Sequence, residues 1–288
     1  MAFARTDSGV AADLRALASQ VHPVFMLPPL AASAFGAVLA RDAGARLDAG
    51  LVALHLAAVF CALYTAHVKD GYVDFYGRGE DDDHPMSERG CRRALALSSA
   101  AFFVALAAVY ALVGPVAAAL VLPGWLVGYL HAPQLDTNPV TATTGYPLGI
   151  GFALLGGYYV QAGALAATPV AFAAVFVVLL SGIKVVDDAK DYVYDRSIDK
   201  RTVAVVLGRE RARPAGFAVM ATGMLAVLAL ATLTPVFPTS TVVAPAGFVV
   251  VAVLTRRLDP ERTTMVLIRG SYLFMALLVV AVWWRPLG

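Results

Sequence analysis

Charged residues and cysteines are scarce in this chain, and each shortage excludes a class of protein. Only 15% of the 288 residues are Asp, Glu, Lys or Arg, whereas a soluble domain has about a quarter. The net charge of +2, without a basic tail or groove-reading motif, argues against nucleic acid as a partner. Cys61 and Cys91 lack metal-ligand spacing and lie in or beside apolar segments, which favours free core thiols over a disulfide.

Apolar residues are abundant instead, at 59% of the chain, with a mean hydropathy of +0.73. A membrane core of about 30 Å needs about 20 apolar residues per helix. We therefore expect an all-α polytopic membrane protein, a single domain over residues 1–288, with nine transmembrane helices. The expected spans are 22–41, 48–68, 92–112, 114–132, 145–163, 166–186, 213–233, 238–255 and 264–284.

Two further expectations concern the N-terminal part. The first twenty residues carry four charges and lack the short apolar core of a cleavable signal peptide. Residues 1–21 are expected to form an interfacial segment, in which 9–20 are predicted to be a short amphipathic helix at the membrane surface.

Lysine and arginine are distributed unevenly between alternate loops. The N-terminal segment and the loops after the second, fourth, sixth and eighth spans hold 18 of the 22 basic residues. The opposite side holds Arg41, Arg46 and Arg285, and Arg269 lies inside the ninth span. Because basic loops stay on the cytoplasmic side, we expect a cell-membrane protein with a cytoplasmic N-terminus and an external C-terminus. The loop after the fourth span carries no basic residue and breaks the pattern.

An acidic cluster follows the second span, in "HVKDGYVDFYGRGEDDDHP" (67–85). Asp70 and Asp74 are four residues apart and would share one helix face, with His67 one turn earlier. Glycines 77 and 79 then introduce a loop that carries Asp81 and two further aspartates.

A second cluster follows the sixth span, in "DDAKDYVYDRSIDKRT" (187–202). Asp188, Asp191 and Asp195 are spaced as i, i+3 and i+7, so a helix would align them in one stripe. Asp187 and Asp199 lie off this stripe, and their loss is expected to matter less.

Carboxylates at this spacing repel one another and cost desolvation energy at a membrane boundary. One such cluster alone would be read most simply as a solvated loop, but two clusters, four spans apart on one membrane face, favour a shared site. Oxygen-only ligands suit Mg²⁺, which shares its coordination sphere with substrate phosphates. Four nearby cations suit the oxygens of a diphosphate: Lys190, Arg196, Lys200 and Arg201.

At this point the residues resemble the UbiA superfamily of intramembrane prenyltransferases. "DDAKDYVYDRSIDKRTVAVVLG" is similar to that family's second motif, with Asp191 and Asp195 at its two aspartates and 200–202 at its K-R-T. The first motif is looser. Two registers fit, both use Asp70 and Asp74, and one extends to Asp81.

The resemblance implies a nine-helix fold in which 69–91 and 187–212 are catalytic loops on the cytoplasmic side. It implies Mg²⁺-dependent transfer of a polyprenyl group from an allylic prenyl diphosphate to a lipophilic or aromatic acceptor in the bilayer. The implied catalytic residues are Asp70, Asp74, Asp191 and Asp195. The implied metal ligands are these four together with Asp81 and Asp188.

The acceptor is less well indicated. "LLGGYYVQAG" (154–163) is similar to the branch that prenylates 1,4-dihydroxy-2-naphthoate in menaquinone biosynthesis. That branch begins its first span with Arg-Pro, where this chain has His22-Pro23, and the basic-free loop "HAPQLDTNPVTATTGY" also argues against a carboxylated aromatic. A lipid, a quinone precursor and a carotenoid-like olefin stay open as acceptors, and the sequence assigns no role to His22, His131 or Arg269.

Two readings from other classes compete with the prenyltransferase. A phosphotransferase acting on nucleotide-activated alcohols would begin with Asp-Gly, as at 70–71, but would continue with an Ala-Arg pair and keep its aspartates on one segment. A cation carrier would place ionisable groups near the membrane midplane, whereas almost all of them here fall at helix ends.

Overall fold

The computed structural model describes residues 3–255 and 257–283, and most of them are helical. Within this part, the only extended pairing joins Ala4 to Met86, so the all-α prediction is confirmed. The helical elements in chain order are α1 (Val10–Ala18), α2 (Pro23–Asp42), α3 (Ala49–Tyr72), η1 (Val73–Arg78), α4 (Glu88–Val113), α5 (Pro115–Leu130), η2 (His131–Leu135), α6 (Pro139–Ala162), α7 (Ala167–Asp188), α8 (Tyr192–Ser197), α9 (Val203–Leu207), α10 (Arg209–Leu233), η3 (Thr239–Val242), α11 (Val243–Thr255) and α12 (Pro260–Trp283).

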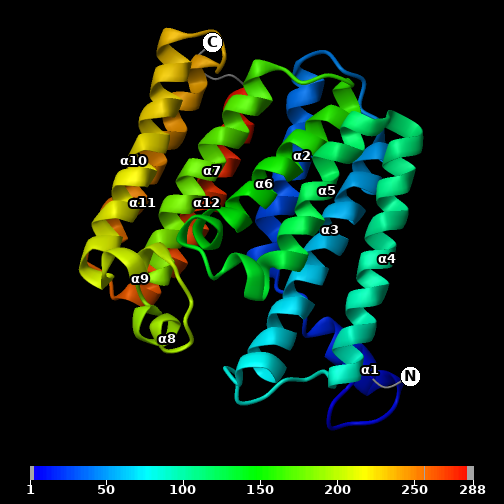
Figure 1. Cartoon of the computed structure of the whole chain (residues 1–288). Helices are drawn as coiled ribbons and strands as arrows, with labels where there is room; N and C mark the ends of the chain where they lie inside the picture. The colour runs from blue at the N-terminus through cyan, green and yellow to red at the C-terminus, as the bar shows by residue number, and fades with distance from the viewer. Residues whose placement is uncertain (1–2, 256, 284–288) are drawn as a thin grey trace.

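The long helices stand side by side in one bundle (Figure 1). Helices α2, α6 and α7 form its centre, with α3, α4 and α5 packed on one side and α10, α11 and α12 on the other. The loops 79–87 and 189–208 lie at the same end, which is the lower end in Figure 1. We call this the polar end.

Seven of the described helices are long and apolar enough to cross a membrane, which makes the chain an integral membrane protein. They are α2, α3 with η1, α4, α5 with η2, α7, α10 and α12. The other two expected spans correspond to α11, which is short even with η3, and to α6, whose threonines and glycines make it less apolar. The total of nine spans stays a prediction.

Four helices begin at the polar end several residues earlier than expected, at Glu88, Pro139, Arg209 and Pro260 instead of 92, 145, 213 and 264. Capping explains three of these starts, and at the last of them the Asp259 side chain accepts a hydrogen bond from the Arg262 amide. The side chain of Ser87 accepts a hydrogen bond from the Gly90 amide, and that of Asn138 accepts one from the Val140 amide. Capping side chains satisfy the free amides of a first turn, so polar first turns extend beyond the apolar pattern.

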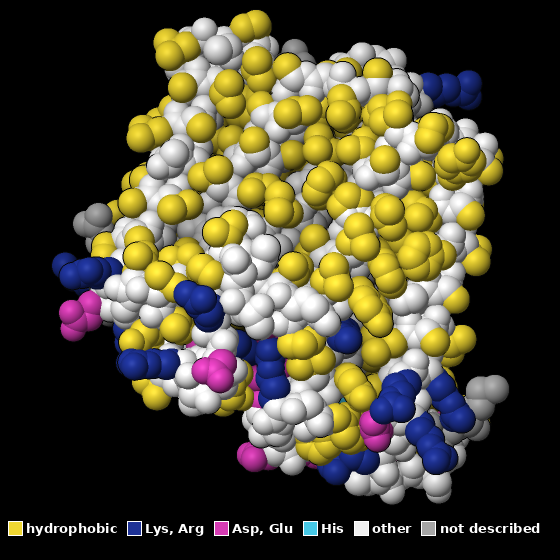
Figure 2. All heavy atoms as spheres, in the orientation of Figure 1, with side chains coloured by type: hydrophobic (Ala, Val, Ile, Leu, Met, Phe, Trp, Pro, Cys, Tyr) yellow, Lys and Arg dark blue, Asp and Glu magenta, His cyan; other side chains and the backbone are white. Residues whose placement is uncertain are grey.

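Charged side chains gather at the polar end (Figure 2). The upper part of this face is covered by hydrophobic side chains, except for one basic group at its far edge. The helix predicted near the N-terminus is present as α1 at the polar end. Arg269 is exposed and lies near the middle of α12, as the tenth of its 24 residues. Arg256, Arg285 and the C-terminus, which entered the charge comparison, lie outside the described residues.

The central helices approach so closely that only glycine fits at the contact. A Cβ on Gly157 of α6 would lie 2.2 Å from the carbonyl oxygen of Ser33 on α2, and one on Gly36 would lie 2.2 Å from the carbonyl oxygen of Leu154. Small residues permit this kind of packing between membrane helices. The contact fixes α2 against α6, and both helices line the site described below.

Gly157→Ala is therefore expected to destabilise the bundle by about 1–3 kcal/mol, because the added methyl group must push α2 away from α6. The measurement is unfolding of the purified chain in mixed micelles. Gly149→Ala on the same helix is the control, since a Cβ there meets nothing within 4 Å. Equal stability of the two variants would contradict the close contact.

Candidate functional site

A cavity of about 570 Å³ opens at the polar end and reaches into the bundle. Its inner wall is apolar and includes Pro29, Val59, Leu120 and Phe152. Its mouth is acidic, and the carboxylates that line it are Asp70, Asp74, Asp81, Asp83 and Asp187. The cavity thus joins a charged mouth to an apolar interior.

The first acidic segment is shaped by the end of α3. The helix continues beyond Tyr72 into the wider turn η1, which carries Asp74 and Arg78. The Arg78 guanidinium lies between two carboxylates, 3.4 Å from Asp74 and 2.5 Å from Asp136. The three side chains are at most 17% exposed, so Arg78 compensates two largely buried negative charges.

Asp136 connects this segment to the second one. It follows a kink at Ala132, where η2 leaves helical geometry (φ −119°, ψ 135°). While its side chain accepts from Arg78, its backbone oxygen accepts a hydrogen bond from the Arg201 amide at 3.1 Å. The other side-chain oxygen of Asp136 is buried without a hydrogen-bond partner.

The second acidic segment differs from the expected single helical stripe. Helix α7 ends at Asp188, the chain turns at 189–191, and α8 begins at Tyr192. That expectation was wrong because Asp191 precedes α8 with non-helical geometry (φ −92°, ψ 8°). Asp188 and Asp195 are almost fully buried, and Asp191 is exposed.

Burial and like charge raise the pKa of Asp195 to about 6, since the neighbouring Asp188 adds repulsion to the loss of water. Lys200 and Lys184 oppose the shift. Burial also raises the pKa of Asp191, against the attraction of Lys190. A bound cation would stabilise the ionised form of both carboxyl groups.

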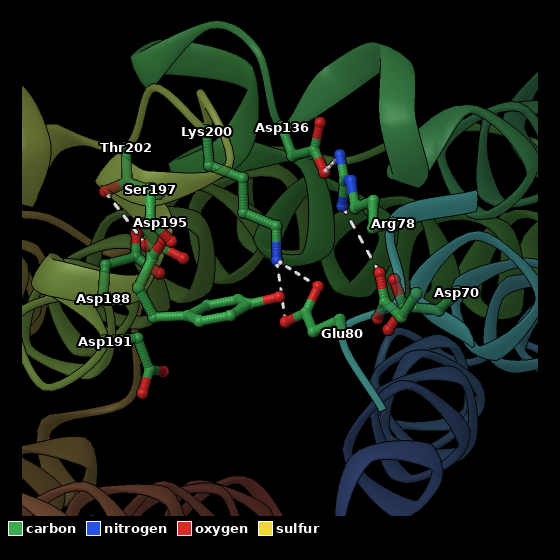
Figure 3. Close-up of polar contacts among 12 residues, drawn as sticks. Asp70, Arg78, Glu80, Asp136, Asp188, Asp191, Asp195, Ser197, Lys200 and Thr202 are labelled. Carbon is green, nitrogen blue, oxygen red and sulfur yellow. Dashed lines mark hydrogen bonds and ion pairs between the residues drawn. The ribbon is translucent and has the colours of Figure 1, made fainter. Parts of the chain in front are cut away.

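The four expected diphosphate-binding cations fall into two pairs. Lys190 lies 2.7 Å from Asp187 and 3.6 Å from Asp191. Lys200 points across the mouth to Glu80 of the first segment, at 3.5 Å from each carboxylate oxygen (Figure 3).

The other pair, Arg196 and Arg201, is exposed at the surface of the polar end. The structure therefore brings the lysines into the acidic site and leaves both guanidinium groups at its rim.

Three residues at the site were not predicted from the sequence. Glu80 was not singled out, Arg78 was counted only as a basic loop residue, and Asp136 was noted only as a polar residue of a basic-free loop. Asp187, expected to matter less, lines the cavity between Lys184 and Lys190. Arg78 and Asp136 are 58 residues apart, and Glu80 and Lys200 are 120 apart, so local spacing carries no signal for these two pairs.

Within the described residues, no group of three or more His, Cys, Asp or Glu side chains is arranged to hold a metal ion alone. The donors nevertheless suit Mg²⁺, which is commonly bound through one or two carboxylates, waters and substrate phosphates. One carboxylate oxygen of the buried Asp188 has no hydrogen-bond partner, while the other accepts a hydrogen bond from the Lys184 side chain. A free carboxylate oxygen beside Asp195 fits a cation with hard oxygen ligands.

The helical membrane bundle and its acidic-mouthed cavity define an integral membrane protein with an internal binding chamber. The sequence matches the model of the UbiA prenyltransferase family over residues 30–278. The chain belongs to this family and is a prenyltransferase. No curated protein matches it significantly.

Solved structures give the same fold. A UbiA homologue from Archaeoglobus fulgidus bound to GPP and Mg²⁺ has a TM-score of 0.67 and 16% identity, covering 94% of this chain and 99% of that one. An apo UbiA homologue from Aeropyrum pernix K1 has a TM-score of 0.68 and 18% identity, covering 91% and 98%. A structure of digeranylgeranylglyceryl phosphate synthase has a TM-score of 0.70 and 13% identity, covering 94% and 97%.

Arg78→Met is expected to destabilise the chain by about 3–5 kcal/mol, because it leaves two largely buried carboxylates without a counter-charge. The double variant Arg78→Met/Asp136→Leu should recover much of this loss. Unfolding in mixed micelles measures both. Arg92→Met is the matched control, since the Arg92–Glu88 pair is exposed, and no measurable change is expected there. A single variant as stable as the control would contradict the role of Arg78.

The affinity for Mg²⁺ is expected to depend on pH through Asp195. Its carboxyl is neutral below its raised pKa of about 6, so a cation must then displace a proton. Apparent affinity should be constant between pH 7 and 8 and fall about tenfold per unit below 6. Calorimetric titration with a prenyl thiodiphosphate present measures this. Asp195→Asn serves as the control, because its pH dependence comes from the thiodiphosphate alone. If the wild-type chain and this variant show the same dependence of Mg²⁺ affinity on pH, Asp195 does not control it.

Proposed function

We propose that this chain transfers a polyprenyl group from an allylic prenyl diphosphate to a lipophilic or aromatic acceptor inside the membrane, with Mg²⁺ as cofactor. The observation that carries the proposal is the meeting of two acidic segments, distant in sequence, beside the mouth of one apolar cavity. The bundle of the Archaeoglobus fulgidus homologue that binds GPP and Mg²⁺ supports it. We treat residues 1–288 as one domain, with 69–91 and 187–212 as its catalytic loops.

The acidic residues are assigned to the metal in two groups. Asp70 and Asp74 would hold it from the first segment, with Asp81 at the rim, and Asp188, Asp191 and Asp195 would hold it from the second. When bound, Mg²⁺ stabilises the negative charge that develops on the diphosphate as its bond to carbon breaks.

The remaining roles belong to the cations and the cavity wall. Lys190 and Lys200 bind the diphosphate, and Lys200 exchanges its contact with Glu80 for a phosphate oxygen. Arg196 and Arg201 meet the same group from the rim. The apolar wall holds the prenyl chain and excludes water, which would otherwise capture the allylic carbon.

The polar end is assigned to the cytoplasmic side of the cell membrane, because 18 of 22 basic residues fall on the side of its loops. Two classes of acceptor fit this proposal. One is the carboxylated naphthalenediol of menaquinone biosynthesis, suggested by residues 154–163. The other is a carotenoid or lipid acceptor reached by the same chemistry. Family membership argues against the phosphotransferase and the cation carrier.

Asp74→Asn and Asp191→Asn are each expected to lower prenyl transfer by roughly 100- to 1,000-fold, because each removes a charge that holds the metal diphosphate. The assay follows diphosphate release from a radiolabelled prenyl diphosphate in membranes, with and without Mg²⁺. Asp199→Asn is the matched control. Asp199 lies at φ 58°, a geometry that asparagine also adopts, and lies off the site. Full activity of either site variant would contradict the proposed function.

A further inference from the structure

Five imidazoles line the cavity, and three of them form a group around His67, beside the acidic mouth. His22 precedes α2, His67 lies on α3, and His131 begins the kink after α5. The rings of His22 and His67 are in contact, with centroids 4.7 Å apart and planes tilted by 35°, and Nε2 of His131 lies 4.0 Å from Asp70. They come from three elements, so the bundle itself builds this group, which we call the histidine cluster.

The histidine cluster has unused hydrogen-bonding capacity. Within the described part of the chain, the ring nitrogens of His22 and His67 have no hydrogen-bond partner, although each imidazole offers two polar nitrogens. Both rings face a cavity whose inner wall is apolar. A ligand that enters the cavity can supply the missing partners.

The charge of the lining restricts what that ligand is. Among the described lining residues, Lys184 is the only lysine and there is no arginine. Lys184 is already bound by Asp188 and lies 3.6 Å from Asp187. Five carboxylates line the mouth, and the diphosphate takes the metal there. A carboxylate or phosphate ester on the acceptor would lose its hydration without gaining a cation, which disfavours its binding.

An aromatic surface adjoins the histidine cluster. The rings of Phe25 and His67 have centroids 6.4 Å apart. Tyr146 also lines the cavity, and its hydroxyl donates to the backbone oxygen of Phe25 at 2.8 Å, which fixes the position of its ring. Aromatic faces of this kind bind flat rings by stacking or edge contact.

Resting on the proposed function, we propose that the acceptor is a neutral hydroxylated aromatic, a phenol or hydroquinone, whose hydroxyl is bound by His22 and His67. Transfer to such a ring forms one bond between the prenyl C1 and a ring carbon and breaks the C1–O bond. The diphosphate leaves with that electron pair, and the ring loses one proton, which the diphosphate accepts. A neutral acceptor decides against the carboxylated naphthalenediol of the proposed function, and against glyceryl phosphates, because the described cavity lining offers neither of them a free lysine or arginine.

The test uses a matched pair of probes, 1,4-naphthalenediol and its 2-carboxylate, with the full chain in nanodiscs at pH 8, where the acid is ionised. Binding of each probe is measured with Mg²⁺ and a geranylgeranyl thiodiphosphate present. Binding of the thiodiphosphate alone is measured separately. The diol is expected to bind at least tenfold more tightly than the carboxylate.

The variants test which residues bind the hydroxyl. His22→Ala/His67→Ala should weaken diol binding about tenfold, from the loss of two hydrogen bonds, and leave thiodiphosphate binding unchanged. His67→Gln keeps a hydrogen-bonding group and should retain part of the affinity. Phe60→Ala, on the same helix but outside this cavity, is the control.

The outcomes separate this inference from the proposed function. Tighter binding of the carboxylate, binding of neither probe, or a histidine double variant that binds the diol normally would each overturn the inference. Failure of the wild-type chain to bind the thiodiphosphate with Mg²⁺ would instead contradict the proposed function, and with it the inference that rests on it.

Discussion

Carboxylates from two distant segments stand together at one end of a membrane bundle, and the rest of the structure accommodates their mutual repulsion. Arg78 lies between Asp74 and Asp136, and Lys200 reaches Glu80 across the mouth. The contacts of Arg78 with Asp136 and of Lys200 with Glu80 join parts of the chain that are far apart in sequence. The protein thus compensates only part of its negative charge, and the remainder is available to a cation.

The partial compensation has a chemical consequence. A fully neutralised cluster would have no reason to bind a metal, and an uncompensated one would separate the loops. Asp188 keeps one free oxygen, and Asp195 keeps a raised pKa, because neither has a full partner. Both groups therefore suit a divalent cation, and in the proposed function the diphosphate would supply the oxygens that the protein lacks.

Helix packing decides where this charge meets the substrate. Glycines on α2 and α6 allow these helices to touch, while other walls of the bundle stay apart and leave a cavity of about 570 Å³. Its depth is apolar, its mouth is acidic, and the histidine cluster lies between them. One chamber thus offers three environments, suited in turn to a prenyl chain, a neutral polar group and a metal diphosphate.

Much of this arrangement could be predicted from the sequence, because apolar runs and acidic spacing are local features. The helices fell near the expected spans, and Asp70 and Asp74, which are four residues apart, both line the cavity mouth. Helix starts at Glu88 and Pro139 were missed, since caps extend helices into polar sequence.

The contacts between segments could not be predicted in this way. Asp136 follows the kink at Ala132, and its side chain pairs with Arg78, which is 58 residues away in sequence. The second acidic segment breaks between α7 and α8. The spacing of its aspartates does not reveal this break, because the same spacing fits an unbroken helix equally well.

The central claim is that both acidic segments hold one metal diphosphate. Mn²⁺ binding followed by electron paramagnetic resonance, with and without a prenyl thiodiphosphate, tests it most directly. The account predicts that the thiodiphosphate tightens Mn²⁺ binding, and that neutralising either Asp74 or Asp195 removes this gain. Mn²⁺ binding that is indifferent to the thiodiphosphate, or that depends on one segment alone, would contradict it.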